Sequence, residues 1–328
     1  MHNIPEETDL VTVTKTVTIK YNNMIVTVPC SPKLYGISEG NIKEFYLKLQ
    51  IDKGKFKEFS NVEGERLRIH AIIFVPETMT SLGWTNAFKT QELWFEGVAN
   101  SNMNIVDPVL DFVPVSWVRS FERIDDEYAE LISEDWKLSG KIDLLKDEIR
   151  KMVTNGLVSW PTTNNNLVNF GTFSKSLVTY NGEKMPEIEQ YYYCFRGYEI
   201  SMIPLEPLDD FFGTFASFNW HVAAKGILEY VNPTDVKVTI QKIGVYIKDN
   251  FDFDSMEDGE YTDEKLGAWD FLEKDVDRIN MYTKAGEFKI SNMDYRNYRT
   301  ELGKGYNYHY YSEVKELNVT PFEFTFII

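Results

Sequence analysis

Two runs of alternating apolar and polar residues flank the turn sequence Asn232-Pro233-Thr234-Asp235. A period of two residues is typical of strands with one buried face, and this turn is rich in residues that reverse the chain. The apolar positions of the two runs are Phe218, Trp220, Val222, Ala224, Val236, Val238 and Ile240. The pattern predicts an antiparallel pair of strands in the C-terminal half.

Helical periodicity is strongest in the middle of the chain. Its predicted stretches are 76–97, 117–136 and 144–153, with Gly97 and Gly156 as stop residues. Near the N-terminus, alternation predicts a β hairpin that turns at Asn22-Asn23, and strand character returns from Leu67 to Val75.

Strands that come in runs, rather than alternating with helices, favour an α+β fold over a doubly wound one. We predict an N-terminal β hairpin, a helical middle region and a C-terminal, mainly antiparallel β-sheet. The corresponding ranges are 1–75, 76–158 and 165–328, with a linker at 161–166. They are expected to form separate regions or one compact unit.

The charge of the chain limits its partners. Its 328 residues include 34 Lys+Arg and 51 Asp+Glu, a formal net charge of −17. An excess of this kind repels phosphate backbones, so we expect no nucleic-acid partner.

No apolar run reaches the roughly 18 residues of a membrane span, which predicts no transmembrane segment. Met1–Glu7 lacks the basic and apolar parts of a secretory signal. We therefore expect a cytoplasmic protein in the producing cell that, if secreted, leaves without a signal peptide.

The segment from Tyr246 to Trp269 concentrates carboxylates, and three interpretations of it stay open. Clustered hard oxygen ligands suit calcium or magnesium, with Asp252, Asp254 and Asp258 as candidate ligands, although the EF-hand spacing is not matched. Packed carboxylates also raise one another's pKa values, as in catalytic acid–base pairs. The third interpretation is a solvated or partner-facing loop, the commonest role of a charge run.

Arg296 and Arg299 lie three residues apart, on one side of the chain if it is helical. The structural interpretation is that one of them clamps the acidic 249–254 loop, because guanidinium groups bind carboxylates through two hydrogen bonds. The functional interpretation is that both hold an anionic substrate opposite those acids. The catalytic candidates are then Asp249, Asp252, Asp254, Arg296 and Arg299.

The four histidines show no zinc-binding spacing. His70 and His221 lie in strand-like runs and are predicted to be structural. His309 lies in the ring-rich stretch 306–311, where packing is the main expectation and lining a pocket is the alternative.

Several short motifs occur together in a fixed order. They are Pro76-Glu77-Thr78-Met79, Phe212-Gly213-Thr214-Phe215, Gly244-Val245-Tyr246-Ile247-Lys248-Asp249, Leu266-Gly267-Ala268-Trp269, Asn292-Met293-Asp294-Tyr295-Arg296 and Gly303-Lys304-Gly305. Over roughly residues 70 to 315 the chain resembles an uncharacterised bacterial family, a domain of unknown function (family 6402) often encoded near type VI secretion genes. The sequence departs from the usual pattern at Phe251, where the family has tyrosine, and in a longer acidic link to Leu266. The resemblance implies a setting and an approximate fold, but no activity.

That setting is competition between bacteria, and three hypotheses follow from it. The first is a secreted effector (toxin) or its cargo domain. The second is a non-enzymatic, acidic immunity or adaptor protein, whose charge suits a basic toxin surface. The third is an enzyme that uses the 249–254 acids with Arg296 and Arg299. The expected partner is a protein: a component of the secretion apparatus, a cognate effector or an immunity protein.

Overall fold

The computed structural model divides the chain into two compact units, each assembled from three separate segments. It describes residues 16–21, 24–29, 58–60, 66–68, 71–100, 106–133, 135–180, 182–198, 208–254, 256–257, 260–261, 264–270, 275–277 and 288–327. Unit 1 comprises Met1–Asn100, Ser201–Phe215 and Asp252–Asn307, and unit 2 comprises Ser101–Ile200, Ala216–Phe251 and Tyr308–Ile328. The predicted ranges 1–75, 76–158 and 165–328 stay a prediction.

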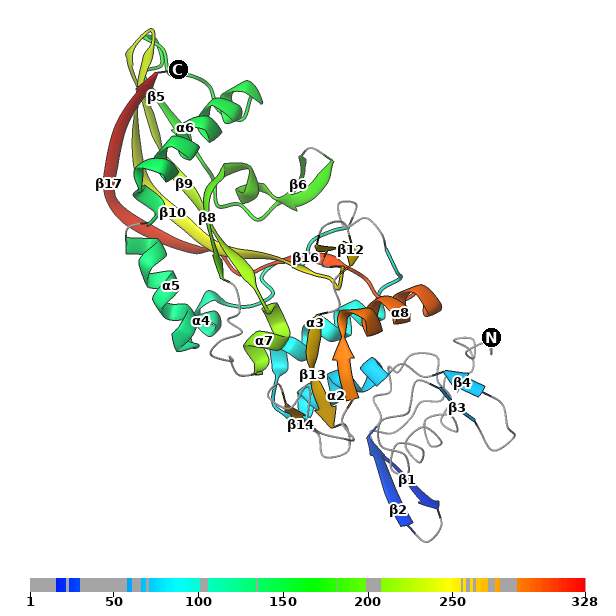
Figure 1. Ribbon diagram of the computed structural model, residues 1–328. Coiled ribbons are helices and arrows are strands. Elements are labelled where there is room, and N and C mark those ends of the chain that lie inside the picture. The colour runs from blue at the N-terminus through cyan, green and yellow to red at the C-terminus, as the bar shows by residue number, and fades with distance from the viewer. Residues whose placement is uncertain are drawn as a thin grey trace. The chain divides into compact units, whose positions relative to one another are not determined.

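Unit 2 is built on a six-stranded antiparallel sheet (Figure 1). Its strands are β5 (Leu167–Phe170), β8 (Tyr192–Tyr198), β9 (Phe218–Asn232), β10 (Asp235–Phe251), β16 (Tyr308–Tyr311) and β17 (Lys315–Ile327). β9 and β10 form the predicted antiparallel pair, and the structure places them at the centre of the sheet: β5 and β8 pair with β9, and β16 and β17 pair with β10. At the turn, the Asn232 side-chain oxygen accepts hydrogen bonds from the backbone N–H groups of Thr234 and Asp235, at 2.9 and 3.0 Å. This Asn-based turn confirms the predicted reversal.

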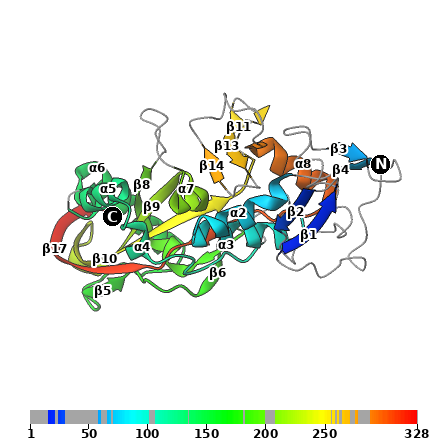
Figure 2. The same ribbon diagram turned by 90° about the horizontal axis from the view of Figure 1, so that it is seen from below.

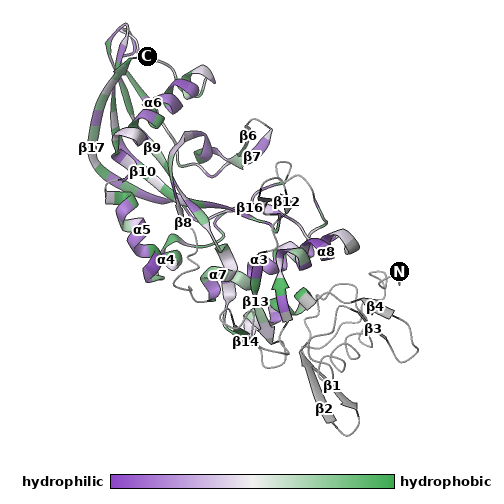
Figure 3. Ribbon diagram, viewed as in Figure 1, coloured by the Kyte–Doolittle hydropathy of each residue, from purple (hydrophilic) through white to green (hydrophobic). Residues whose placement is uncertain are grey.

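Successive residues of β9 and β10 point to opposite faces of the sheet. Figure 3 shows hydrophobic and hydrophilic residues interspersed along the strands of this sheet. Trp220 is fully buried on one face, where its ring lies 5.2 Å from that of Tyr128. Tyr128 belongs to a helical layer that Figure 2 shows beside the sheet. This layer comprises α4 (Val115–Val118), α5 (Glu122–Ser133), η4 (Asp135–Lys137) and α6 (Ser139–Thr154). The predicted stretch 117–136 is thus broken into short helices, whereas 144–153 lies within α6.

The predicted stop at Gly156 is confirmed, because this residue has φ +73° directly after α6. A Cβ there would meet no atom within 4 Å, so Gly156→Ala isolates the backbone strain. We expect it to lower the free energy of unfolding by about 1 kcal/mol. Gly140→Ala, inside α6 and equally free of close contacts, is the control; it should raise stability by about 0.5–1 kcal/mol. Urea unfolding measures both, and equal effects would contradict the interpretation.

Unit 1 contains helices and short antiparallel strands. Its elements are β1 (Thr16–Tyr21), β2 (Met24–Pro29), β3 (Glu58–Ser60), β4 (Arg66–Arg68), η2 (Ala71–Phe74), α2 (Val75–Ser81), α3 (Thr85–Glu96), α7 (Asp210–Phe215), β11 (Met256–Glu257), β12 (Glu260–Tyr261), β13 (Lys265–Asp270), β14 (Asp275–Asp277), β15 (Phe288–Ser291) and α8 (Asn292–Leu302). The N-terminal hairpin is confirmed by the pairing of β1 with β2, while Asn22 and Asn23 lie outside the described residues.

Two expectations for unit 1 are corrected. The predicted helical stretch 76–97 is two helices, because the chain adopts φ +77° at Gly83, which a helix does not tolerate. The predicted strand from Leu67 to Val75 is wrong from Ala71 onward, since η2 and the start of α2 occupy 71–75. Apolar runs of this length do not distinguish a strand from a buried helical turn.

Local sequence explains why α8 forms. Ser291 and Asp294 make a reciprocal capping box at its start, and Gly303, with φ +64°, ends it. Arg296 and Arg299 are therefore on a helix, one turn apart.

The chain has an α+β fold with mostly antiparallel sheets, as predicted. The long β9–β10 hairpin and β17 place the largest sheet in its C-terminal half. Within the part of the chain that the structure describes, no helix is both long and apolar enough to cross a membrane.

Candidate functional site

In unit 1, the acidic stretch and the arginines of α8 meet. Arg299 donates two hydrogen bonds to the carboxylate of Asp254, with N–O distances of 2.7 and 2.5 Å. Arg296 donates to the backbone carbonyl of Phe253 at 2.6 Å. The structural interpretation of these arginines, that one of them clamps the acidic loop, is confirmed.

The clamp continues into the core of unit 1. Asn307 Nδ2 donates to Asp254 at 2.7 Å, and Asn307 Oδ1 accepts a hydrogen bond from the indole N–H of Trp94 at 3.0 Å. Phe253 stacks on Tyr295 of α8 with ring centroids 3.7 Å apart. Arg299, Asp254, Asn307 and Trp94 thus form a chain of hydrogen bonds, which we call the arginine clamp.

The remaining predicted residues lie differently. Asp252 accepts a hydrogen bond from the backbone N–H of Asp254 at 2.9 Å, and burial raises the pKa of its carboxyl group. Asp249 belongs to unit 2, where it accepts a hydrogen bond from the Tyr310 hydroxyl at 2.7 Å. The catalytic role of the five candidates stays a prediction.

The candidate cation site is only partly described, because Asp258 lies outside the described residues. Within the described ranges, no three His, Cys, Asp or Glu side chains are grouped as metal ligands. The proposed binding of calcium or magnesium by Asp252, Asp254 and Asp258 therefore stays a prediction.

In unit 2, a second cluster lies on the sheet face opposite Trp220. Because β9, β10 and β16 are antiparallel neighbours, alternate residues of these strands share that face: His221, Tyr246, Lys248, Asn250, His309 and Tyr311. Glu183, on β7 (Glu183–Pro186), and Glu189, on η5 (Glu187–Tyr191), add two carboxylates. We call these eight residues the histidine–glutamate cluster.

Glu189 is the centre of this cluster, with a side chain only 2% exposed. It accepts a hydrogen bond from Tyr246, and one oxygen lies 3.0 Å from His221 Nδ1 while the other lies 3.0 Å from Lys248 Nζ. Burial alone would raise the pKa of Glu189, but His221, Lys248 and Tyr246 together lower that pKa to about 2. Glu189 is therefore a buried carboxylate that stays ionised at neutral pH.

An ionised carboxylate only accepts hydrogen bonds, so His221 Nδ1 carries the proton in this pair. When the ring is neutral, its lone pair is on Nε2, for which the described residues supply no partner. Tyr192 stacks on the ring at 4.6 Å and fixes its plane. This is the geometry of a histidine oriented by a carboxylate for proton transfer.

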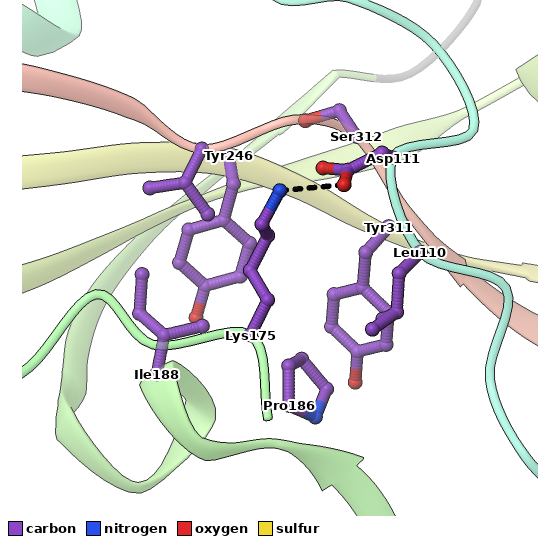
Figure 4. Close-up of a pocket in the computed structure, with 9 residues that line it drawn as sticks. Leu110, Asp111, Lys175, Pro186, Ile188, Tyr246, Tyr311 and Ser312 are labelled. Carbon is purple, nitrogen blue, oxygen red and sulfur yellow. Dashed lines mark hydrogen bonds and ion pairs between the residues drawn. The ribbon is translucent and has the colours of Figure 1, made fainter. Parts of the chain in front are cut away.

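A pocket of about 210 Å³, including the space open to solvent, adjoins the cluster. Tyr246 and Tyr311 stand on either side of it in Figure 4, and Ile188 and Pro186 close one end. Across the opening, Lys175 forms an ion pair with Asp111 at 2.5 Å. The pocket is thus mainly apolar, with a charged rim.

Sequence reasoning found the pairing of an arginine with the acidic loop, but it missed Asn307 and Trp94 in the arginine clamp and the whole of this cluster. His221 is buried and paired, in agreement with a structural role, yet nothing in its local sequence indicates that Glu189 is its partner. For His309 the sequence favours packing, with lining a pocket as the alternative; the residue is buried and is not among those that line the described pocket.

Comparison with known proteins identifies one family. The model described as "Family of unknown function (DUF6402)" matches residues 71–326, most of the chain. No curated protein and no solved structure matches the sequence.

Proposed function

This chain belongs to DUF6402, a family of unknown function, and we propose that it is a type VI secretion-associated protein of competition between bacteria, acting as a secreted effector (toxin) or its cargo domain. The setting comes from the resemblance of its motifs to that family. The observation that carries the effector assignment is the His221–Glu189 pair in unit 2.

In this proposal, His221 Nε2 removes a proton from a water molecule or a substrate hydroxyl, and returns it to a leaving group. Glu189 remains ionised and holds the protonated ring, while Tyr246 and Lys248 keep Glu189 in place. The reaction class is hydrolysis or group transfer by acid–base catalysis. The negative net charge argues against a nucleic-acid substrate.

The alternative is an acidic immunity or adaptor protein that binds a partner toxin without catalysis. It is favoured by the net charge of −17 and by three carboxylates on α5 and η4 that surround one arginine of β8. Arg196 contacts Glu127, Glu130 and Asp135, so this group keeps two excess negative charges. Such charge accelerates encounters with a basic partner.

Expression of the full chain in the bacterial cytoplasm and, with an added leader, in the periplasm tests the proposal. We expect growth arrest in one compartment, and its loss in His221→Gln. The control is Glu187→Gln, on the same 3₁₀ helix as Glu189, which should keep the arrest.

Arrest that persists in His221→Gln would remove His221 from the reactive centre. Normal growth in both compartments, together with tight binding to the product of a neighbouring gene, would favour the immunity or adaptor role instead.

A further inference from the structure

Two buried polar atoms at β16 point to a binding site. His309 and Tyr311 are 7% and 2% exposed, yet among the described residues neither His309 Nε2 nor the Tyr311 hydroxyl has a hydrogen-bond partner. Native proteins pair the great majority of buried polar atoms, because an unpaired one forfeits its hydration without compensation. Two such atoms, two residues apart on one strand, require a common explanation.

The chemistry of the two atoms is complementary. His309 Nδ1 lies 2.5 Å from the side-chain oxygen of Asn250, which only accepts, so Nδ1 carries the proton and Nε2 is an acceptor. Burial and the nearby Lys248 lower the pKa of His309, which keeps the ring neutral. Burial raises the pKa of Tyr311, whose hydroxyl remains a donor. The pair therefore presents one acceptor and one donor.

The two side chains share one environment. Their Cα atoms lie two residues apart on one strand, about 6.6 Å, and the same two carboxylates, Glu183 and Glu189, act on both side chains. His309 and Tyr311 share a face of β16, because the strand pairs them with Asn250 and Lys248. Tyr311 also lines the pocket in Figure 4.

The surroundings exclude an anion. The Glu183 carboxylate lies 3.6 Å from His309 Nε2, and Glu189 is the strongest charged influence on Tyr311. Both carboxylates repel a second negative group, whereas Lys248 already supplies their cation at 3.4 and 3.0 Å. A carbonyl oxygen would satisfy Tyr311 but not His309, because it has no proton to donate.

We propose that His309 Nε2 and the Tyr311 hydroxyl bind one neutral hydroxyl group, which accepts from Tyr311 and donates to His309. The hydroxyl belongs either to a water molecule or to an alcohol, such as a polyol or saccharide. The site lies on the same sheet face as His221 but uses different atoms, and it does not depend on the effector role.

Tyr311→Phe tests the proposal, because the sign of its effect depends on the hydroxyl. If the hydroxyl were unpaired, its removal would leave stability unchanged or increase it. If it binds a water, removal loses a hydrogen bond and lowers the folding equilibrium constant about fivefold in plain buffer. Urea unfolding of the full chain measures this constant. Tyr193→Phe is the reference, since the Tyr193 hydroxyl donates to the Trp136 carbonyl at 2.9 Å and its loss should weaken folding similarly.

A titration with sorbitol distinguishes a water molecule from an alcohol as the source of the hydroxyl. If the hydroxyl belongs to a water molecule, Tyr311→Phe shows the fivefold loss in the folding equilibrium constant without sorbitol. Added sorbitol then raises the melting temperature of wild type and Tyr311→Phe by the same amount. If the hydroxyl belongs to an alcohol, the stability difference between the two proteins develops only when sorbitol is added. Sorbitol then raises the melting temperature of wild type saturably, and Tyr311→Phe lacks this rise. A Tyr311→Phe protein at least as stable as wild type, both in buffer and in sorbitol, would overturn the site.

Discussion

Replacing Glu189 with glutamine is expected to lower the free energy of unfolding by about 3 kcal/mol at pH 7. The shape of the side chain is kept, but its charge is lost between His221 and Lys248. A shift of the Glu189 pKa from 4.5 to about 2 corresponds to roughly that energy, since each pKa unit is about 1.4 kcal/mol. The Glu189 side chain is nearly fully buried, so solvent screening removes little of it.

The pH dependence of this loss has a defined sign. Because folding lowers the pKa of Glu189, its contribution is complete above pH 4.5 and is lost as the pH falls from 4.5 towards 2. The stability gap between wild type and Glu189→Gln should therefore be constant between pH 5 and 7 and shrink below pH 4.5. Urea unfolding at a series of pH values measures the gap.

Glu187→Gln is the matched control, since it makes the same change two residues away on a half-buried side chain. It should change the free energy of unfolding by no more than about 0.5 kcal/mol. An equal loss in both variants, or a gap that does not change below pH 4.5, would contradict the role assigned to Glu189.

Replacing Arg299 with alanine is expected to lower the free energy of unfolding by about 2 kcal/mol. The change leaves the Asp254 carboxylate with Asn307 as its remaining side-chain donor in the arginine clamp. Removing one partner of a fully buried pair costs about 3–5 kcal/mol; here Arg299 and Asp254 are 18% and 27% exposed, so the cost is smaller.

Two further variants sharpen this measurement. Arg119→Ala breaks an exposed ion pair with Asp125 and should cost at most about 1 kcal/mol. Arg299→Lys keeps the charge but not the two parallel hydrogen bonds, so it should recover only part of the stability. An Arg299→Ala protein as stable as Arg119→Ala would show that the clamp contributes little. Loss of growth arrest in an Arg299→Lys protein of unchanged stability would favour a catalytic role for Arg299.

The parts of the fold that the sequence predicted well depend on neighbouring residues. The β9–β10 hairpin follows from alternation on both sides of a four-residue turn. The end of α6 at Gly156 follows from the conformational freedom of glycine. The prediction failed at 71–75, where a short apolar segment fits more than one local conformation. It also failed at Gly83, where the positive φ of a glycine breaks the predicted helix in two.

The two candidate sites differ in how far they could be predicted from the sequence. The arginine–carboxylate pairing of the arginine clamp was predictable because opposite charges stand out in a sequence, and because Arg299 and the acidic stretch offer complementary groups. The pairing of His221 with Glu189 was not predictable. It depends on which face of β9 carries the histidine, and on η5 covering that face, neither of which is marked by a local motif.

The sequence by itself determined the α+β class, the β9–β10 hairpin and the acidic character of this protein, because each arises from residues close together in the chain or from composition. Tertiary structure alone decided that Glu189, His221, Tyr246 and Lys248 share one buried group. The physical reason is that a carboxylate removed from water needs hydrogen-bond donors and positive charges from neighbouring side chains. Only the folded chain brings these groups together.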